Sequence, residues 1–102
     1  MELISFPQVK APAPGEAIRV DVKGVPVAIF NLGGELRAIE ARCTHRGGPL
    51  EKGAVTGRLV TCPWHGSQFD LDTGQVARGP AITPERTYPV RVEQNVLVVE
   101  AP

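Results

Sequence analysis

Two short stretches of the sequence each place a cysteine close to a histidine. Residues 43 to 50 read CTHRGGPL, and residues 62 to 70 read CPWHGSQFD. Thiolates and imidazoles are ligands for zinc, copper and iron–sulfur clusters, and the neighbouring glycines and prolines indicate loops. The sequence contains two cysteines and two histidines in all. We therefore interpret Cys43, His45, Cys62 and His65 as a candidate metal site.

Four interpretations of this pattern differ in how they explain the duplication. Taken singly, each residue is more often a core cysteine or a surface histidine than a ligand. A tetrahedral zinc site accepts two thiolates and two imidazoles, although zinc knuckles usually pair like ligands within one loop. A cysteine nucleophile with a histidine base leaves the second pair without a purpose. A [2Fe–2S] centre of the Rieske type requires two thiolates on one iron and two imidazoles on the other, which explains one of each per loop.

Both stretches resemble a known family. CTHRGGPL and CPWHGSQFDLDTG are similar to the two cluster-binding loops of Rieske ferredoxins, the small proteins that supply electrons to bacterial aromatic-ring oxygenases. The resemblance implies one [2Fe–2S] cluster per chain. It also implies that Cys43 and Cys62 bind the buried iron, and that His45 and His65 bind the outer iron at an exposed tip.

The resemblance further suggests residues that surround the cluster. Ser67 matches a serine whose hydroxyl hydrogen-bonds a bridging sulfide in some Rieske proteins, and Pro80, in the sequence GPA, matches a loop that shields the cluster. Trp64 either covers the cluster, contacts a partner or is a plain core tryptophan. The respiratory members carry a pair of clamping cysteines where this chain has Gly48 and Trp64, and a tyrosine where it has Phe69. These departures predict a reduction potential in the lower half of the Rieske range.

Composition excludes several classes of protein. Eleven basic residues balance eleven acidic ones, so no basic excess is available for nucleic acid or an anionic membrane. The first residues, MELISFPQVK, lack the pattern of a signal peptide, and no run of eighteen apolar residues occurs. We expect a cytoplasmic protein. Arg42, Arg46 and Arg78 flank the two loops and form either a solvated rim or a surface for an acidic partner.

The remaining sequence predicts an all-β fold in one domain. Residues 17 to 22 and 25 to 30 are typical of a hairpin with a Lys23-Gly24 turn, and Gly33-Gly34 indicates a second turn before a strand that begins at residue 35. Residues 86 to 93 and 96 to 100 predict another hairpin. We expect residues 1 to 102 to form an antiparallel sandwich or barrel of Rieske type. Its basal part spans residues 1 to 41 and 81 to 102, and a loop-rich cluster-binding part spans residues 42 to 80.

The expected function is electron transfer without catalysis. The resemblance implies a carrier that accepts one electron from a flavin-dependent reductase and passes it to a terminal oxygenase, with no small-molecule substrate of its own. A mononuclear iron site would need further histidines and a carboxylate, and His45 and His65 are the two that the sequence has. Two alternatives stay open: a small subunit of an assimilatory nitrite reductase, and a zinc-stabilised interaction module without redox activity.

Overall fold

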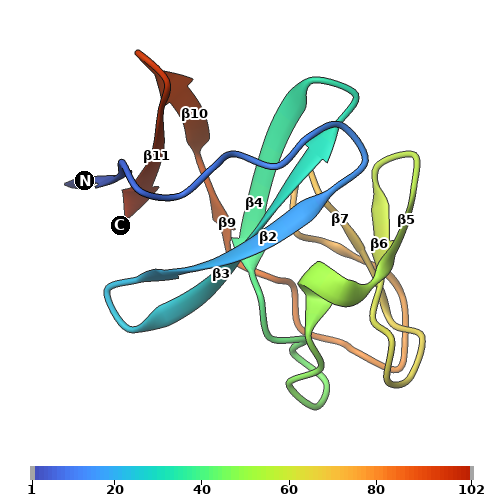
Figure 1. Cartoon of the computed structure of the whole chain (residues 1–102). Helices are drawn as coiled ribbons and strands as arrows, with labels where there is room; N and C mark the ends of the chain where they lie inside the picture. The colour runs from blue at the N-terminus through green and yellow to red at the C-terminus, as the bar shows by residue number, and fades with distance from the viewer. Residues whose placement is uncertain (1, 102) are drawn as a thin grey trace.

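A four-stranded antiparallel sheet forms the centre of the molecule in the computed structural model (Figure 1). The structure describes residues 2 to 101. Its strand order is β2-β3-β4-β9. The strands are β2 (Ala17–Val22), β3 (Val25–Leu32), β4 (Glu35–Glu40) and β9 (Thr87–Tyr88).

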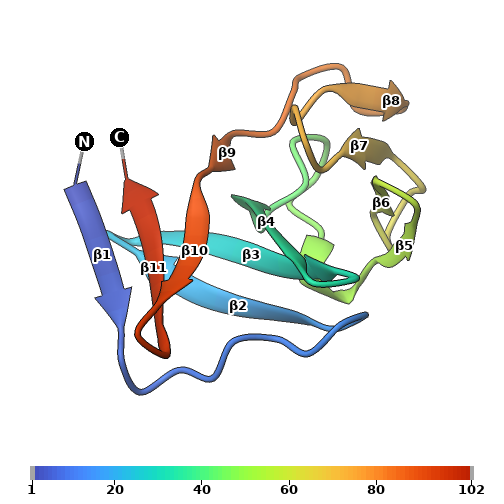
Figure 2. The same cartoon turned by 90° about the horizontal axis from the view of Figure 1, so that it is seen from above.

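One further sheet lies on each side of the central sheet (Figure 2). The first has the order β1-β11-β10 and consists of β1 (Glu2–Phe6), β10 (Val90–Glu93) and β11 (Val96–Ala101). The second has the order β5-β6-β7-β8 and consists of β5 (Ala54–Thr56), β6 (Leu59–Thr61), β7 (Gln68–Asp70) and β8 (Val76–Arg78). A single 3-10 turn, η1 (Leu50–Lys52), precedes β5.

Strand β3 is buried on both faces because each flanking sheet covers one of them. Its sequence, VPVAIFNL, is almost continuously apolar, as expected for a strand without a solvent face. Val27 and Ile29 pack into the core shared with the β1-β11-β10 sheet. Ala28 and Phe30 pack on the opposite side, into the core that also contains Cys43 and Cys62. The central sheet therefore separates two cores, and the candidate ligands belong to the second.

The two predicted turns of the central sheet are confirmed. Lys23 and Gly24 both have positive φ, at 53° and 84°, and β2 pairs with β3 on either side of them. Gly33 and Gly34 also have positive φ and connect β3 to β4. A two-residue hairpin turn with positive φ at both positions matches the twist of its strands, and glycine adopts this conformation without steric strain.

Other sequence-based expectations need correction. Residues 86 to 93 do not form one strand: β9 ends at Tyr88 and β10 begins at Val90, and the two belong to different sheets. Pro89 separates them, because proline has no N–H to donate to a sheet. Within the loop-rich segment of residues 42 to 80, the structure adds four short strands of three residues each. The strand β1 was also not predicted individually.

Ion pairs connect the central sheet to the β5-β6-β7-β8 sheet. Arg37 Nε lies 2.7 Å from Asp72 Oδ1, and Arg58 Nη2 lies 2.9 Å from Glu35 Oε1. Arg58 Nη1 also contacts Asp72 Oδ1 at 3.2 Å, so the four charges alternate in sign. Because exposed pairs contribute about 0–1 kcal/mol each, the shared apolar core provides most of the cohesion between these two sheets.

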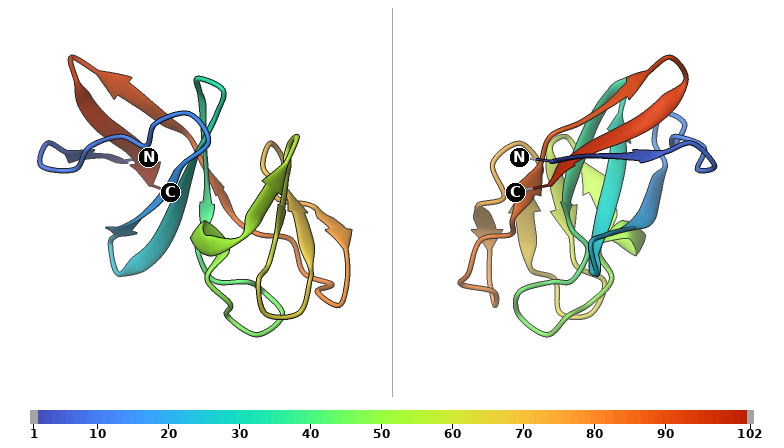
Figure 3. Two further views of the ribbon diagram at one scale, coloured as in Figure 1. Left: turned by 45° about the vertical axis from the view of Figure 1, so that its right-hand side comes forward. Right: turned by 90° about the vertical axis from the view of Figure 1, so that its left-hand side faces the viewer.

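The all-β antiparallel fold predicted from the sequence is confirmed. Figures 1 and 3 show the loops around residues 45 and 64 side by side at one end of the molecule. The ends of the described chain lie close together and away from these loops, because Glu2 pairs with Ala101 (Figure 1). Within residues 2 to 101, no helix has the length and apolar character needed to cross a membrane. The division into a basal part and a cluster-binding part stays a prediction.

Candidate metal centre

The two Cys/His loops have the same backbone hydrogen bonds. In the first loop, Cys43 N donates to Gly48 O at 2.9 Å and Gly47 N donates to Cys43 O at 2.7 Å. In the second loop, the N–H of Cys62 donates to the carbonyl of Ser67 at 2.7 Å, and that of Gly66 donates to the carbonyl of Cys62 at 3.1 Å. In each loop, therefore, the cysteine N–H donates to the carbonyl of the fifth residue after it, and the N–H of the fourth residue donates to the cysteine carbonyl. The loops match in structure although their histidines differ in spacing.

Glycine is needed at the same point in both loops. Gly47 has φ 78° and Gly66 has φ 80°, a conformation that side chains other than glycine rarely adopt. Each glycine closes its loop by donating to the carbonyl of the cysteine four residues earlier. The positive φ values explain why a glycine follows each histidine closely in the sequence.

Both cysteine side chains are free thiols buried in one core. Cys43 is 4% exposed and Cys62 is 3% exposed, and neither forms a disulfide. Burial raises the pKa of the Cys43 thiol, the Cys62 thiol raises it further, and the backbone N–H groups of His45 and Arg46 oppose the rise. The structure therefore brings the two sulfurs together, with backbone donors directed at one of them. Because thiolates bind metals, a metal between them would favour the deprotonated form.

The two histidine rings also meet, but nearer the surface. Their centroids are 5.1 Å apart and the rings are edge to face, with an interplanar angle of 84°. His45 is half-buried and His65 is exposed. The four candidate ligands thus divide into an inner pair of sulfurs and an outer pair of imidazoles, from loops separated by nineteen positions along the chain.

This donor set fits a two-iron cluster better than a single metal ion. Among residues 2 to 101, no group of three or more histidine, cysteine, aspartate or glutamate side chains converges to hold one metal ion. A zinc site of the Cys2His2 kind requires four donors around one point. A Rieske cluster instead requires a sulfur pair on one iron and an imidazole pair on the other, which is the division observed.

A third segment, residues 79 to 86, is attached to both loops. Ala81 N donates to Ser67 Oγ at 3.0 Å, and Thr44 Oγ1 donates to the Thr83 carbonyl at 2.6 Å. Ser67 is fully buried, and its Oγ acts as an acceptor in the bond from Ala81. A hydroxyl has one proton and two acceptor lone pairs, so the proton of Ser67 is still available for a sulfide.

Glu85 is a buried acidic residue that the sequence analysis did not single out. Its side chain is 4% exposed, and Oε2 accepts a hydrogen bond from Thr44 N at 3.1 Å. Burial raises the pKa of Glu85 to about 8, and the nearby carboxylate of Glu40 adds to the rise, while the Thr44 N–H and Arg42 oppose it. Nothing in the local sequence TPERTY distinguishes this glutamate from a surface residue.

The surface around the histidines is partly apolar and carries basic residues. Trp64 is 56% exposed, so it is not a core tryptophan, and Ile82 is 92% exposed. A Cβ placed on Gly48 would lie 3.1 Å from Trp64 Cγ, so the indole lies against the first loop. Pro80 is exposed in the segment between β8 and β9.

The three arginines predicted to flank the loops are exposed, but they are not equivalent. Arg42 Nη2 lies 3.4 Å from Glu40 Oε2. By contrast, no carboxylate within residues 2 to 101 pairs with Arg46 or Arg78. Their charges are therefore available to a partner.

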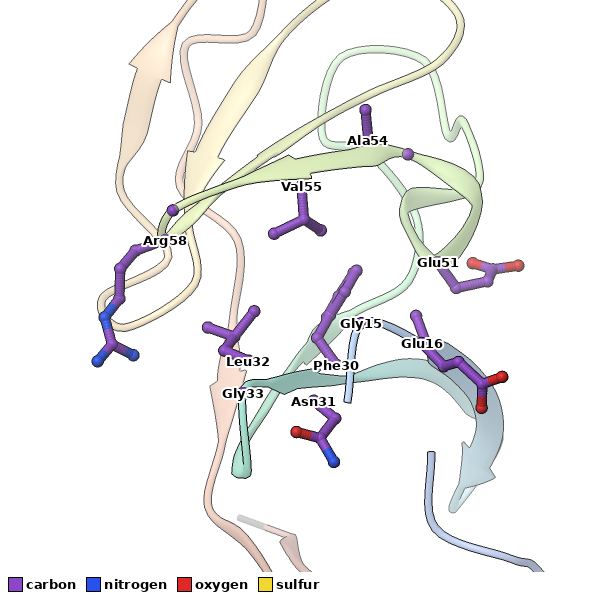
Figure 4. A pocket seen from close by; sticks show the side chains of 13 residues that line it. Gly15, Glu16, Phe30, Asn31, Leu32, Gly33, Glu51, Ala54, Val55 and Arg58 are labelled. Carbon is purple, nitrogen blue, oxygen red and sulfur yellow. The ribbon is translucent and has the colours of Figure 1, made fainter. Parts of the chain in front are cut away.

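A groove of about 640 Å³ lies elsewhere, between β3 and β5 (Figure 4). Phe30, Leu32 and Val55 point into it. None of its lining residues belongs to either Cys/His loop, and none is a cysteine or histidine. The candidate redox chemistry is therefore confined to the loop end of the molecule.

Comparison with known proteins agrees with this arrangement. The chain is 40% identical over 89 residues to the 3-phenylpropionate/cinnamic acid dioxygenase ferredoxin subunit of Escherichia coli K12, covering 86% of this chain and 83% of that protein. A chain in the complex of reduced oxygenase and oxidized ferredoxin in carbazole 1,9a-dioxygenase is 31% identical, with TM-score 0.84, covering 95% of this chain and 91% of that one.

A third comparison bears on the fold alone. A protein described as the small subunit of a nitrite reductase (NADPH) has TM-score 0.80 over 99% of this chain and 100% of its own, but only 19% identity. The family model of the Rieske [2Fe–2S] domain matches residues 4 to 89, which include both loops and the segment that connects them. With its inner sulfur pair, its outer imidazole pair and this match over most of its length, the chain belongs to the Rieske [2Fe–2S] domain family.

Proposed function

We propose that this protein is a Rieske ferredoxin that carries one electron at a time from a flavin-dependent reductase to the terminal oxygenase of an aromatic-ring dioxygenase system. The observation that carries the proposal is the pairing of buried thiols with imidazoles at the surface. The 40% identity to a dioxygenase ferredoxin subunit supports the same function. The carrier itself is not an enzyme and takes no small-molecule substrate.

The ligands follow from the two pairs. Cys43 and Cys62 bind the inner iron, and His45 and His65 bind the outer iron of one [2Fe–2S] cluster per chain. When bound, the cluster accepts and releases a single electron. The buried sulfur side excludes water, and the backbone N–H groups near Cys43 favour added negative charge. Because His45 is half-buried and His65 is exposed, the shortest path for an electron between the cluster and a partner protein lies at the histidine end of the molecule.

Partner proteins contact the surface around the histidines. Trp64 and Ile82 provide apolar contacts, and the exposed Arg46 and Arg78 attract a surface with acidic residues. The carbazole 1,9a-dioxygenase complex of oxygenase and ferredoxin supports the oxygenase as one partner. The reductase is the second. The balanced charge supports neither nucleic acid nor membrane as a partner, and we propose a cytoplasmic location.

The two alternatives have less support. The likeness to a nitrite reductase small subunit is at 19% identity, which supports a common fold only. A zinc-stabilised module has less support because the matching family model is that of a [2Fe–2S] domain, and because the thiols are buried while the imidazoles meet nearer the surface.

Two measurements test the proposal. Metal and sulfide analysis of the purified protein should give two irons and two acid-labile sulfides per chain, as one [2Fe–2S] cluster requires. Zinc without sulfide would exclude a redox function. In a mixture with a flavin-dependent reductase and a dihydroxylating oxygenase, the protein should restore product formation. Co-purification with a nitrite reductase flavoprotein would instead support the role of a nitrite reductase small subunit.

A further inference from the structure

The two buried polar side chains within residues 2 to 101 both lie where the segment 79 to 86 meets the cluster loops. They are Ser67, in the second loop, and Glu85, in the segment itself. Burying a carboxyl group costs free energy, because the group loses its hydration, unless hydrogen bonds compensate for that loss. Glu85 therefore requires an explanation that packing alone does not provide.

The carboxyl of Glu85 contacts the first cluster loop between its two ligands. Oε2 accepts the hydrogen bond from Thr44 N, and Thr44 stands between Cys43 and His45. The loop's own bonds involve Cys43 N and Gly47 N, so they leave the Thr44 N–H for Glu85. The peptide that joins Cys43 to Thr44 connects the two ligands, and its orientation affects the direction of both side chains.

Glu85 is itself held on a rigid backbone. Its N–H donates to the Gly74 carbonyl at 2.8 Å. A Cβ on Gly74 would lie 2.1 Å from the Glu85 carbonyl oxygen, so the two backbones are in close contact. On the loop side, Thr44 Oγ1 donates to Thr83 O, two residues before Glu85. The hydrogen bond from Thr44 to Glu85 thus joins two segments that are each fixed by other contacts.

We propose that Glu85 is a positioning residue for the iron–sulfur centre, because its carboxyl accepts the Thr44 N–H and so sets the orientation of Cys43 and His45. The inference rests on the proposed ligand set. Glu85 is not a metal ligand; it acts through Thr44. Residues that orient metal ligands typically change metal affinity by about 10- to 100-fold when they are replaced.

Three variants of the holoprotein test this role. Glu85→Gln keeps an acceptor oxygen for Thr44 N–H, whereas Glu85→Leu has similar volume and no acceptor. Glu100→Gln is the matched control, because Glu100 is a partly buried glutamate that pairs with Arg91 in the β1-β11-β10 sheet. The measurements are iron and sulfide content, the electron paramagnetic resonance g-values of the reduced protein, the midpoint potential, and the rate of cluster loss to a chelator.

The glutamine variant and the control should match the wild type in all four measurements. The leucine variant should show shifted g-values and a shifted midpoint potential, and should lose its cluster about 10- to 100-fold faster. If it does not fold, Glu85→Met provides a second variant without an acceptor. A leucine or methionine variant with wild-type g-values and potential would overturn the proposal, and so would a glutamine variant perturbed as strongly as leucine. A wild-type protein without iron and sulfide would instead refute the proposed function.

Discussion

The buried carboxyl of Glu85 should make the oxidised protein less stable as the pH rises from 6 to 9. Burial, followed by the neighbouring Glu40, raises the pKa of Glu85 in the folded protein to about 8, against the opposing effects of Thr44 N–H and Arg42. In the unfolded chain a glutamate titrates at about 4.3. Between these two values the folded protein holds a proton that the unfolded chain has released.

The sign and size of the effect follow from this difference. Because the folded state binds the extra proton, the stability contributed by Glu85 is present at low pH and is lost as the pH rises through 8. The slope is about −1.4 kcal/mol per pH unit between the unfolded and folded pKa values and flattens above pH 8. The total loss between pH 6 and pH 9 is about 2.7 kcal/mol. For a domain of this size, that corresponds to a decrease in Tm of roughly 10–20 °C.

The assay is the thermal midpoint of the oxidised holoprotein at pH 6, 7, 8 and 9, for the wild type and Glu85→Gln. Glutamine does not titrate, so its midpoint should change less with pH, and the difference between the two proteins isolates Glu85 from other titrating groups. Glu100→Gln, which leaves Glu85 in place, is the control for the loss of a glutamate elsewhere in the protein. Parallel curves for wild type and Glu85→Gln would refute the reasoning, because they would mean that Glu85 has the same pKa folded and unfolded.

Three other predictions concern the cluster and its partners. His65→Ala should remove one imidazole of the outer pair and prevent a stable cluster; iron and sulfide at wild-type levels in that variant would contradict the ligand assignment. Electron transfer to the oxygenase should slow as salt rises, because exposed charges are screened beyond about 8 Å at physiological ionic strength. At low salt, the stopped-flow rate of electron transfer should fall further below the wild-type rate in Arg46→Ala and Arg78→Ala than in Arg42→Ala, because Arg42 already pairs with Glu40. Rates that do not depend on salt would rule out electrostatic docking. The midpoint potential should lie in the lower half of the range from about −150 to +300 mV. Ser67→Ala should lower it, because the variant lacks the buried hydroxyl whose proton is free to bond a sulfide; protein-film voltammetry that finds a value near the upper limit, or no change in the variant, would disprove this.

Local patterns in the sequence were sufficient to predict the hairpins of the central sheet. The turns at Lys23-Gly24 and Gly33-Gly34 depend on the φ values that two consecutive residues adopt, and the flanking strands are marked by β-branched residues. The break at Pro89 was missed because the apolar residues continue on both sides of it, although the strands join different sheets. The short strands β5 to β8 were missed because three residues are too few for a periodic pattern.

The ligand types and their one-of-each arrangement in two loops could be read from the sequence, because a cysteine, a histidine and a glycine within five positions are local features. Their arrangement in space depended on tertiary structure. The sequence does not reveal that the thiols lie in the core while the imidazoles meet near the surface. Each thiol is paired with the thiol of the other loop, and each imidazole with the imidazole of the other loop. Nor does it single out Glu85, which lies forty-one positions from Thr44 and is buried only because segment 79 to 86 folds back onto the loops. Contacts between distant segments depend on how the sheets pack against one another, and no local pattern of residues encodes that packing.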